Sequence, residues 1–234
     1  MIPWECLDRS FVPGNDQELG LYRRGDEFSI RVGHLELMNS RAHGSEDALA
    51  ELACNRIAAR PSPRMLVGGL GMGFTAAAAL RFLSPESTLV VAELIPAVVT
   101  WNQGVLGHLA EQPLRDPRVG IKIADVADIL RAEKETYDAI LLDVDNGPGG
   151  LTSKANAWLY GVAGLQAASG ALRPGGVLAV WSASADAGFV SRLRQAGFLV
   201  EEKEIRARGH RGSHHIVWLA TRPRVRRAGK KRHS

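Results

Sequence analysis

The chain has 234 residues, of which 45% are hydrophobic and 23% are charged, so it can bury a core as one soluble α/β unit. Its two cysteines, Cys6 and Cys54, do not form a C-x-x-C spacing, which excludes a disulfide framework and a cysteine-rich zinc site. There is no apolar span of about 18 residues and no basic-then-apolar leader, so we expect a cytoplasmic chain with no membrane partner and no metal.

The formal net charge of +4 is unevenly distributed, because seven of the 29 basic residues lie in residues 222–234. The rest of the chain carries 22 basic against 25 acidic residues. We expect residues 222–234 to be a solvated, disordered tail. Weak contact with a polyanion is the alternative for this segment.

The N-terminal part of the chain has the patterning of a small β element, which we assign to residues 15–44. Apolar residues alternate in "EFSIRVGHLELM" around Gly33 and His34, which predicts a β-hairpin. A helix is then predicted over "EDALAELACNRIAA", with Ser45 as its N-cap and Cys54 on its buried face.

Strand and helix patterns alternate regularly within residues 45–221. In chain order the strands are "RMLVGG", "TLVVAEL", "VGIKIAD", "YDAILLDV" and "VLAVWSA", and the helices between and after them are "FTAAAALRFL", "PAVVTWNQGVLGHL", "VADILRAEK", a long helix within 152–172 ended by the turn "RPGG", and "AGFVSRLRQAG". Continuous apolar strands indicate a sheet that helices cover on both faces. The last two strands, "LVEEKEI" and "HHIVWLAT", alternate like an edge pair. We therefore predict a doubly wound, Rossmann-like, mostly parallel sheet after a short N-terminal β-hairpin.

Glycines and acidic residues stand at the carboxyl ends of these strands, where such folds bind their ligands. In chain order they are Gly69, Gly71, Gly73, Glu93, Asp125, Asp143 and Asp145. Each also has a structural interpretation: the glycines as a tight turn, Glu93 as a solvated loop acid and Asp125 as a helix N-cap. Carboxylates at adjacent strand ends repel one another unless a cation lies among them. The pattern therefore favours a sulfonium donor of the S-adenosylmethionine class over a phosphate-bearing dinucleotide.

The segments "LELMNSRAHGSEDALAEL", "PRMLVGGLGMGFT", "VVAELIPAVV", "DPRVGIKIADVADIL", "YDAILLDVDNGPGGLT" and "LRPGGVLAVWS" resemble the spermidine synthase-like (polyamine aminopropyltransferase) family over residues 25–200. The resemblance implies a class I methyltransferase-like fold preceded by a small β domain. It also implies a decarboxylated S-adenosylmethionine donor and transfer of an aminopropyl group to a polyamine amine.

The resemblance also assigns roles to residues. Gly69 and Gly73 match the glycine loop, Glu93 the ribose-binding acid, Asp125 with Val126 the adenine-contacting turn, and Asp143 the catalytic aspartate. Chemistry supports the last role, because a protonated amine needs a carboxylate to hold it and take its proton before it can attack a sulfonium carbon.

The sequence departs from the family pattern at two places. Gly71 stands where the family has an aspartate that receives the free amine of the donor. In "DVDNGPGG" the place of the family's second aspartate, a substrate-binding residue, falls to Asp145, to Asn146 or to neither. Three functions therefore stay open: an aminopropyltransferase, a methyltransferase that uses intact S-adenosylmethionine, and a non-catalytic adenosine-binding module. A nucleic-acid methyltransferase is a sub-case that only the basic tail suggests. A small-molecule amine is the expected partner, and a homodimer is one possible assembly.

Overall fold

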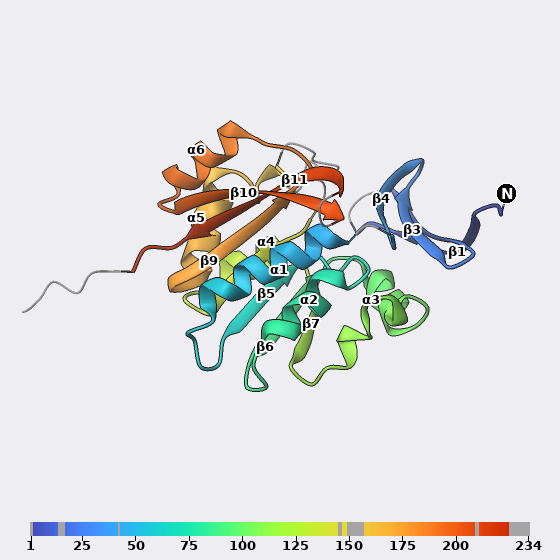
Figure 1. Cartoon of the computed structure of the whole chain (residues 1–234), viewed down its shortest axis with the longest axis horizontal. Coiled ribbons are helices and arrows are strands. Elements are labelled where there is room, and N and C mark those ends of the chain that lie inside the picture. The colour runs from blue at the N-terminus through green and yellow to red at the C-terminus, as the bar shows by residue number, and fades with distance from the viewer. Residues whose placement is uncertain are drawn as a thin grey trace, which may run out of the picture.

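An antiparallel sheet of four strands opens the chain, in the order β1-β2-β3-β4 (Figure 1). The computed structural model describes residues 2–13, 17–41, 43–144, 147–148, 157–208 and 211–224. The strands of the sheet are β1 (Glu5–Phe11), β2 (Glu18–Arg24), β3 (Glu27–Val32) and β4 (Leu35–Asn39). The predicted hairpin is β3–β4, with Gly33 in its turn at φ 57°. The sheet is larger than that hairpin, because β1 and β2 also belong to it. The sequence pattern missed β1 because most of its residues are exposed, so it has no clear apolar alternation.

The larger sheet has seven strands in the order β10-β11-β9-β8-β5-β6-β7. Their bounds are β5 (Arg64–Gly68), β6 (Thr88–Glu93), β7 (Val119–Ile123), β8 (Tyr137–Leu142), β9 (Leu172–Ser182), β10 (Leu199–Arg208) and β11 (Arg211–Thr221). From β7 to β9 all neighbours pair in parallel, whereas β11 is antiparallel to both β9 and β10. The predicted doubly wound sheet and its antiparallel edge pair are confirmed. The direction of winding reverses between β5 and β8, so the crevice beyond their carboxyl ends is the expected ligand site.

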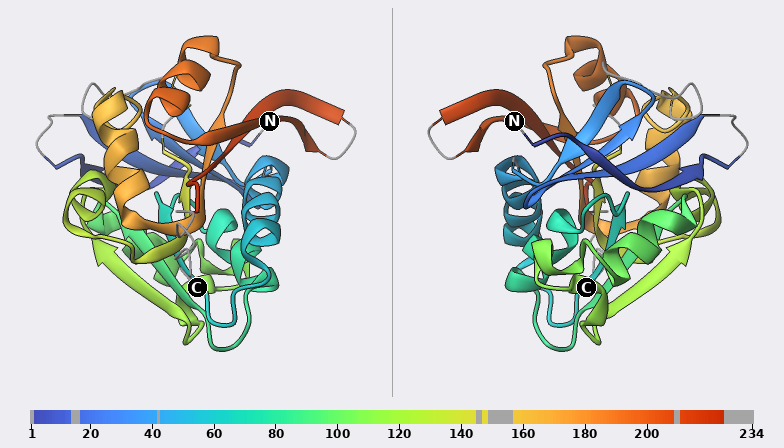
Figure 2. Two further views of the ribbon diagram at one scale, coloured as in Figure 1. Left: turned by 90° about the vertical axis from the view of Figure 1, so that its left-hand side faces the viewer. Right: turned by 90° about the vertical axis from the view of Figure 1, so that its right-hand side faces the viewer.

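Helices cover both faces of this sheet (Figure 2). They are α1 (Gly44–Ile57), α2 (Phe74–Phe82), α3 (Pro96–Gln103), α4 (Val126–Ala132), α5 (Val162–Ala171) and α6 (Ala187–Gln195), with two short 3-10 helices, η1 (Gly107–Ala110) and η2 (Pro113–Arg115). Neighbouring residues of β5 pack against helices on opposite faces of the sheet. Met65 and Val67 pack toward α1 and α2, whereas Leu66 packs toward α4 and α5. Burial on both faces explains why the strands read as continuous apolar runs.

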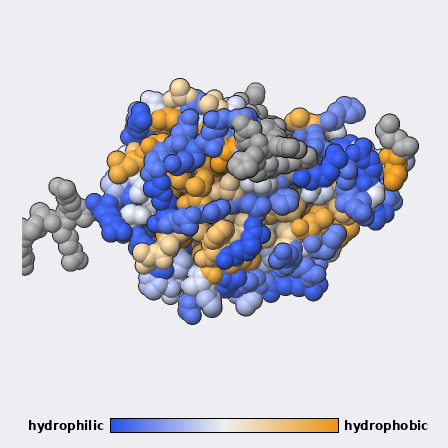
Figure 3. All heavy atoms as spheres, viewed as in Figure 1, coloured by the Kyte–Doolittle hydropathy of each residue, from blue (hydrophilic) through white to orange (hydrophobic). Residues whose placement is uncertain are grey.

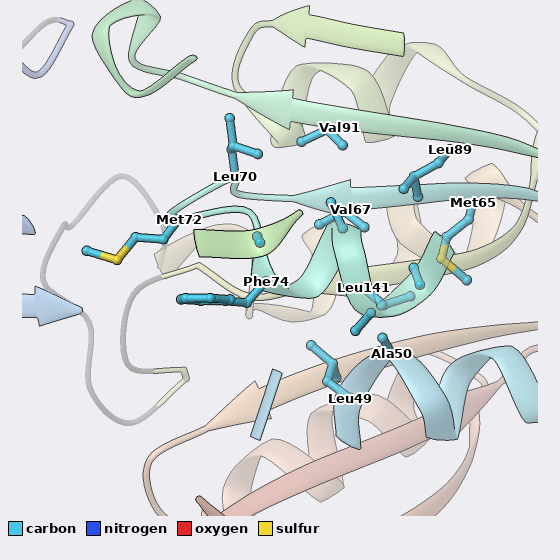
Figure 4. Packing of buried hydrophobic residues seen from close by; sticks show 14 of the residues in the cluster. Leu49, Ala50, Met65, Val67, Leu70, Met72, Phe74, Leu89, Val91 and Leu141 are labelled. Carbon is cyan, nitrogen blue, oxygen red and sulfur yellow. The ribbon is translucent and has the colours of Figure 1, made fainter. Parts of the chain in front are cut away.

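On the face of the sheet that α1 covers, the loop after β5 packs into the same hydrophobic core. Leu49 and Ala50 of α1 face Leu141 and the side chains of β5, and Leu70 and Met72 extend from the loop (Figure 4). Met72 is fully buried although it lies in a loop. The loop that follows β5 is therefore anchored by its own apolar side chains.

The N-terminal sheet contacts α3 and the loop after β5. Trp101 Nε1 of α3 donates to Asp8 Oδ2 of β1 at 2.7 Å. Met38 of β4 packs against Gly71 of the loop. Hydrophobic and hydrophilic residues are interspersed over the face of the molecule shown in Figure 3. In the described part of the chain no helix is long and apolar enough to cross a membrane.

Three local predictions differ from the structure. The N-cap of α1 is His43, and the Ser45 hydroxyl donates to Glu46 Oε2 at 2.6 Å instead of capping the helix. The "RPGG" segment lies within β9, where Gly175 at φ 78° and a register shift take up the irregularity. Arg222, predicted to start the tail, exchanges backbone hydrogen bonds with Gly175 and Gly176. Residues 225–234 of the predicted tail lie outside the described residues.

Candidate active site

The glycine loop between β5 and α2 begins at the point where the winding of the sheet reverses. Gly69 N–H donates to Ala92 O at 2.9 Å, and Asp143 N–H donates to Gly68 O at 3.1 Å, which ties the loop to the ends of β6 and β8. Gly69 has φ 87°, and a Cβ there would lie 2.7 Å from Asp143 O. Only glycine fits this position, because it tolerates both the left-handed backbone and the close approach.

Gly71 lies beneath a side chain of the N-terminal sheet. A Cβ at Gly71 would lie 2.7 Å from Met38 Sδ, so the flexible thioether of Met38 lies where a side chain at this position would begin. Asn102 of α3 supports the loop from below, donating through Nδ2 to Gly71 O at 2.8 Å and to Val98 O at 2.9 Å. Sequence reasoning missed Met38 and Asn102, because neither residue type in its segment signals a loop contact.

Glu93 ends β6 as predicted, and its carboxylate is oriented by backbone amides. Leu70 N–H donates to Oε2 at 2.9 Å and Ile95 N–H donates to Oε1 at 2.8 Å. Burial raises the pKa of Glu93, and these amide hydrogen bonds oppose that rise. The backbone amides of Leu94 and Gly71 lower this pKa as well, so donors of the two adjoining loops face the carboxylate.

Asp143 follows β8 and is partly buried. Thr75 Oγ1, in the first turn of α2, donates to Asp143 Oδ2 at 2.7 Å. Burial raises the pKa of Asp143, and the Thr75 hydrogen bond opposes the rise. Sequence reasoning missed Thr75, because in the segment "FTAAAALRFL" it reads as an ordinary helix residue.

A second carboxylate, which the sequence did not single out, lies near Asp143. Glu46 of α1 is 9% exposed. Burial first, and then the negative charge of Asp143, raise the pKa of Glu46 to about 7. The structure thus brings two carboxyl groups from distant parts of the chain into electrostatic contact.

Asp125 takes the structural role that the sequence offered as an alternative. It is the N-cap of α4, and its Oδ1 accepts from Ala127 N–H at 2.8 Å. Val126 is buried behind the sheet, close to where a Cβ at Gly68 would lie. Asp145 and Asn146, the predicted substrate-binding residues, lie outside the described residues.

Two further observations delimit the site. A groove of about 620 Å³ lies between α2 and the two 3-10 helices, and it is lined by none of the predicted site residues. Among the residues that the structure describes, no group of three or more His, Cys, Asp or Glu side chains could hold a metal ion. The candidate site consists of the glycine loop, Glu93 and Asp143 at the carboxyl edge of the sheet, together with Glu46 at the start of α1.

Comparison with known proteins gives structural relatives only. The sequence matches no protein family profile and no curated protein. The fold is similar to that of a spermidine synthase from Thermotoga maritima, with a TM-score of 0.73 and 18% identity over 92% of this chain and 72% of that one. A probable spermidine synthase from Corynebacterium glutamicum gives a TM-score of 0.61 and 16% identity over 93% and 79% of the two chains.

Methyltransferases share the fold at lower similarity. An O-methyltransferase family protein from Burkholderia thailandensis gives a TM-score of 0.56 and 16% identity over 78% of this chain and 56% of that one. The spermidine synthases match over more of this chain than the methyltransferase does. The chain therefore has the spermidine synthase-like form of the class I methyltransferase-like fold.

Proposed function

We propose that the protein is a transferase that moves an aminopropyl group from a decarboxylated S-adenosylmethionine-type sulfonium donor to an amine. The observation that carries the proposal is the Asp143 carboxylate. Asp143 lies at the reversal point of the sheet with its backbone carbonyl oxygen beside Gly69, and its carboxylate accepts a hydrogen bond from Thr75. A carboxylate in this position can receive a cationic amine beside a ligand that rests on the glycine loop.

The residues of the edge suit a sulfonium nucleoside. Gly69 and Gly73 have φ values of 87° and 85°, so the loop presents backbone without Cβ atoms. Glu93 offers the acceptor atoms that ribose hydroxyls require. In the described part of the chain, Glu93, Asp143 and Glu46 accept hydrogen bonds from amides or hydroxyls and from no basic side chain. Such an anionic environment attracts a cation and opposes a phosphate.

The transfer itself follows from the charges. An ammonium acceptor gives one proton to Asp143, and its nitrogen lone pair then attacks the carbon next to the sulfonium. The new C–N bond forms as the C–S bond breaks, and the bonding electrons leave with the sulfur as a neutral thioether. The carboxylate holds the amine in line and offsets the repulsion between the two cations.

Methyl transfer is the second candidate, and the contact between Gly71 and Met38 favours it. A thioether, and not a carboxylate, faces the place where the family resemblance puts an anchor for the donor amine. Intact S-adenosylmethionine carries a carboxylate that an aspartate there would repel, whereas Met38 would not. A non-catalytic adenosine-binding module is the third reading, and it predicts binding without turnover.

Calorimetry of the protein with three ligands separates these functions. Aminopropyl transfer predicts tight binding of decarboxylated S-adenosylmethionine and methylthioadenosine, followed by a mass increase of the amine acceptor that corresponds to one aminopropyl group. Methyl transfer predicts preference for intact S-adenosylmethionine. Absence of binding to all three ligands would refute the proposal.

A further inference from the structure

Four arginines from three parts of the chain converge on one turn, at the edge of the larger sheet where the parallel strands begin. The turn is formed by residues 173–176 of β9. Arg60, after α1, donates through Nη2 to Pro174 O at 2.8 Å, and Arg222, after β11, exchanges backbone hydrogen bonds with the turn. Arg224 lies over the turn, because its Nε is 2.8 Å from the position of a Cβ at Gly175. We call Arg60, Arg173, Arg222 and Arg224 the arginine cluster.

Carboxylates compensate only part of the charge of the arginine cluster. Asp138, which is 1% exposed, pairs with Arg173 at 2.7 Å and with Arg60 at 3.5 Å. Glu135 pairs with Arg222 at 2.8 Å. Four guanidinium groups against these two carboxylates leave two positive charges without a counterion. The cluster therefore presents a net positive surface and not only a set of ion pairs.

Two exposed cations at this edge have no partner of their own. In the described part of the chain, the side chains of Arg224 and Lys134 form no hydrogen bond and no ion pair, and Lys134 directly precedes the carboxylate that binds Arg222. A groove of about 320 Å³ beside them is lined by Arg56, Arg222 and Arg224, and by no acidic residue that the structure describes. Arg56 is the member of this groove that pairs with Glu201. Guanidinium groups bind phosphate oxygens in pairs, so such a groove suits a phosphate group.

The basic tail of the sequence starts at the arginine cluster. The ten residues that follow Arg224 contain five Arg or Lys and no acidic residue. We propose that the arginine cluster, Lys134 and this tail form one surface that binds the phosphate backbone of duplex DNA without reading its bases. The surface lies at the opposite edge of the sheet from the candidate active site, so the inference goes beyond the proposed function and does not depend on it.

The chemistry of the surface favours duplex DNA over other polyanions. A duplex carries one negative charge per about 1.7 Å of its axis, which is the densest array of phosphates that this many cations can meet. The aromatic residues at the starts of β8 and β10, Tyr137 and Phe198, are buried, so neither ring offers a platform on which an unpaired base could stack. The tail has Val225 and Ala228 as its apolar residues, which gives it little to insert into a bilayer.

A purely structural role is the competing explanation. Arg60, Arg173 and Arg222 hold the turn of β9 through their carboxylate partners, and a solvated tail needs no ligand. That explanation gives no function to Arg224 and Lys134, whose side chains are unpaired among the described residues. These two cations can therefore be neutralised without breaking an ion pair of the fold, which separates the two explanations.

The test measures binding of a fluorescein-labelled duplex DNA of about 20 base pairs to the full chain by fluorescence anisotropy, from about 50 mM to about 200 mM NaCl. Lys134, Arg224 and the five basic residues of the tail give about seven phosphate contacts, so the logarithm of the affinity should fall with the logarithm of the salt concentration with a slope of about −6. A chain that ends at Arg224 should have a slope of about −2 and bind at least about 100-fold more weakly at the lowest salt.

The double variant Lys134→Gln/Arg224→Gln tests the part of the surface that belongs to the fold. It should reduce the slope to about −4.5, because two contacts are lost. The matched control is Arg9→Gln/Arg23→Gln, which removes two exposed arginines from the N-terminal sheet, at the other end of the molecule from the end of β11 (Figure 1). This control should keep the parental slope, since its arginines lie away from the surface. Urea midpoints equal to that of the parent establish that each variant is folded.

Three results overturn the inference. The first is no DNA binding by the parent at about 50 mM NaCl, and the second is a parental slope in the chain that ends at Arg224. The third is a double variant at Lys134 and Arg224 that matches the control, since the tail would then act without the fold. Single-stranded DNA of the same length and vesicles that contain phosphatidylserine should bind more weakly than the duplex, and tighter binding of either one overturns the choice of partner. Methylthioadenosine affinity should be equal in all variants, and its loss in the parent would affect the proposed function alone.

Discussion

Replacing Glu46 by Gln should stabilise the folded protein at alkaline pH and leave its stability nearly unchanged at acidic pH. Burial and the charge of Asp143 raise the pKa of Glu46 from 4.5 to about 7. As the pH rises from about 4.5 to about 7, the unfolded chain gives up the Glu46 proton while the folded chain retains it. The parent therefore loses stability across this window, and loss is complete above the folded pKa.

The magnitude follows from the two pKa values. At about 1.4 kcal/mol for each pH unit between them, the parent loses about 3 kcal/mol of unfolding free energy through Glu46. Gln has the shape of protonated Glu, and its carbonyl oxygen can still accept the Ser45 hydrogen bond. The Gln variant should thus match the parent near pH 4.5 and exceed it by about 3 kcal/mol at pH 8.

Urea titrations of both proteins at pH 4.5 and pH 8 give the difference directly. Comparing variant and parent at each pH cancels the other titrating groups. Glu51→Gln, on the exposed side of α1, should show no such dependence on pH. A Glu46→Gln variant that gains less than about 1 kcal/mol on going from pH 4.5 to pH 8 would refute the reasoning, because Glu46 would then ionise normally in the folded protein.

Three other substitutions test the site and its scaffold. Asp143→Asn should lower turnover by about 100-fold or more while methylthioadenosine affinity changes little, and near-parental activity would remove Asp143 from the mechanism. Glu93→Ala should weaken methylthioadenosine binding by about 2 kcal/mol or more, whereas parental affinity in calorimetry would contradict its ribose-binding role. Asp138→Ala should destabilise the fold by about 3 kcal/mol or more in urea titration, because Asp138 is buried and pairs with Arg173 at 2.7 Å, and an unchanged midpoint would contradict this.

Much of the larger sheet could be predicted because its strands are buried on both faces. Neighbouring residues such as Met65 and Leu66 are buried on opposite faces of the sheet. Each strand therefore shows an uninterrupted apolar run that stands out between helical patterns. The N-terminal sheet was predicted only as its β3–β4 hairpin. Most residues of β1 are exposed, so its polar sequence carries no periodic signal, and its pairing with β2 depends on contacts that the pattern does not encode.

The candidate site could be predicted in part for a related reason. Gly69, Glu93 and Asp143 stand at the carboxyl ends of strands that the sequence already showed, so topology alone brings them together. Glu46 and Thr75 lie on helices, and their place depends on how α1 and α2 dock through His43 and Phe74. That docking is a tertiary contact between residues whose local patterns are those of ordinary amphipathic helices.

The contact between Gly71 and Met38 connects the N-terminal sheet with the proposed reaction. Replacing Gly71 by Asp would require the flexible end of the Met38 side chain to move, since Met38 Sδ lies 2.7 Å from the position of a Cβ, and it would place Asp at φ 53°, a backbone conformation that side chains rarely adopt. Gly71 of the loop and Met38 of the N-terminal sheet therefore pack as neighbours. In the proposed transfer, the donor end beside Gly71 meets a thioether, whereas Asp143 offers its carboxylate to the amine. Charge recognition in this site then falls on the amine acceptor more than on the distal end of the donor.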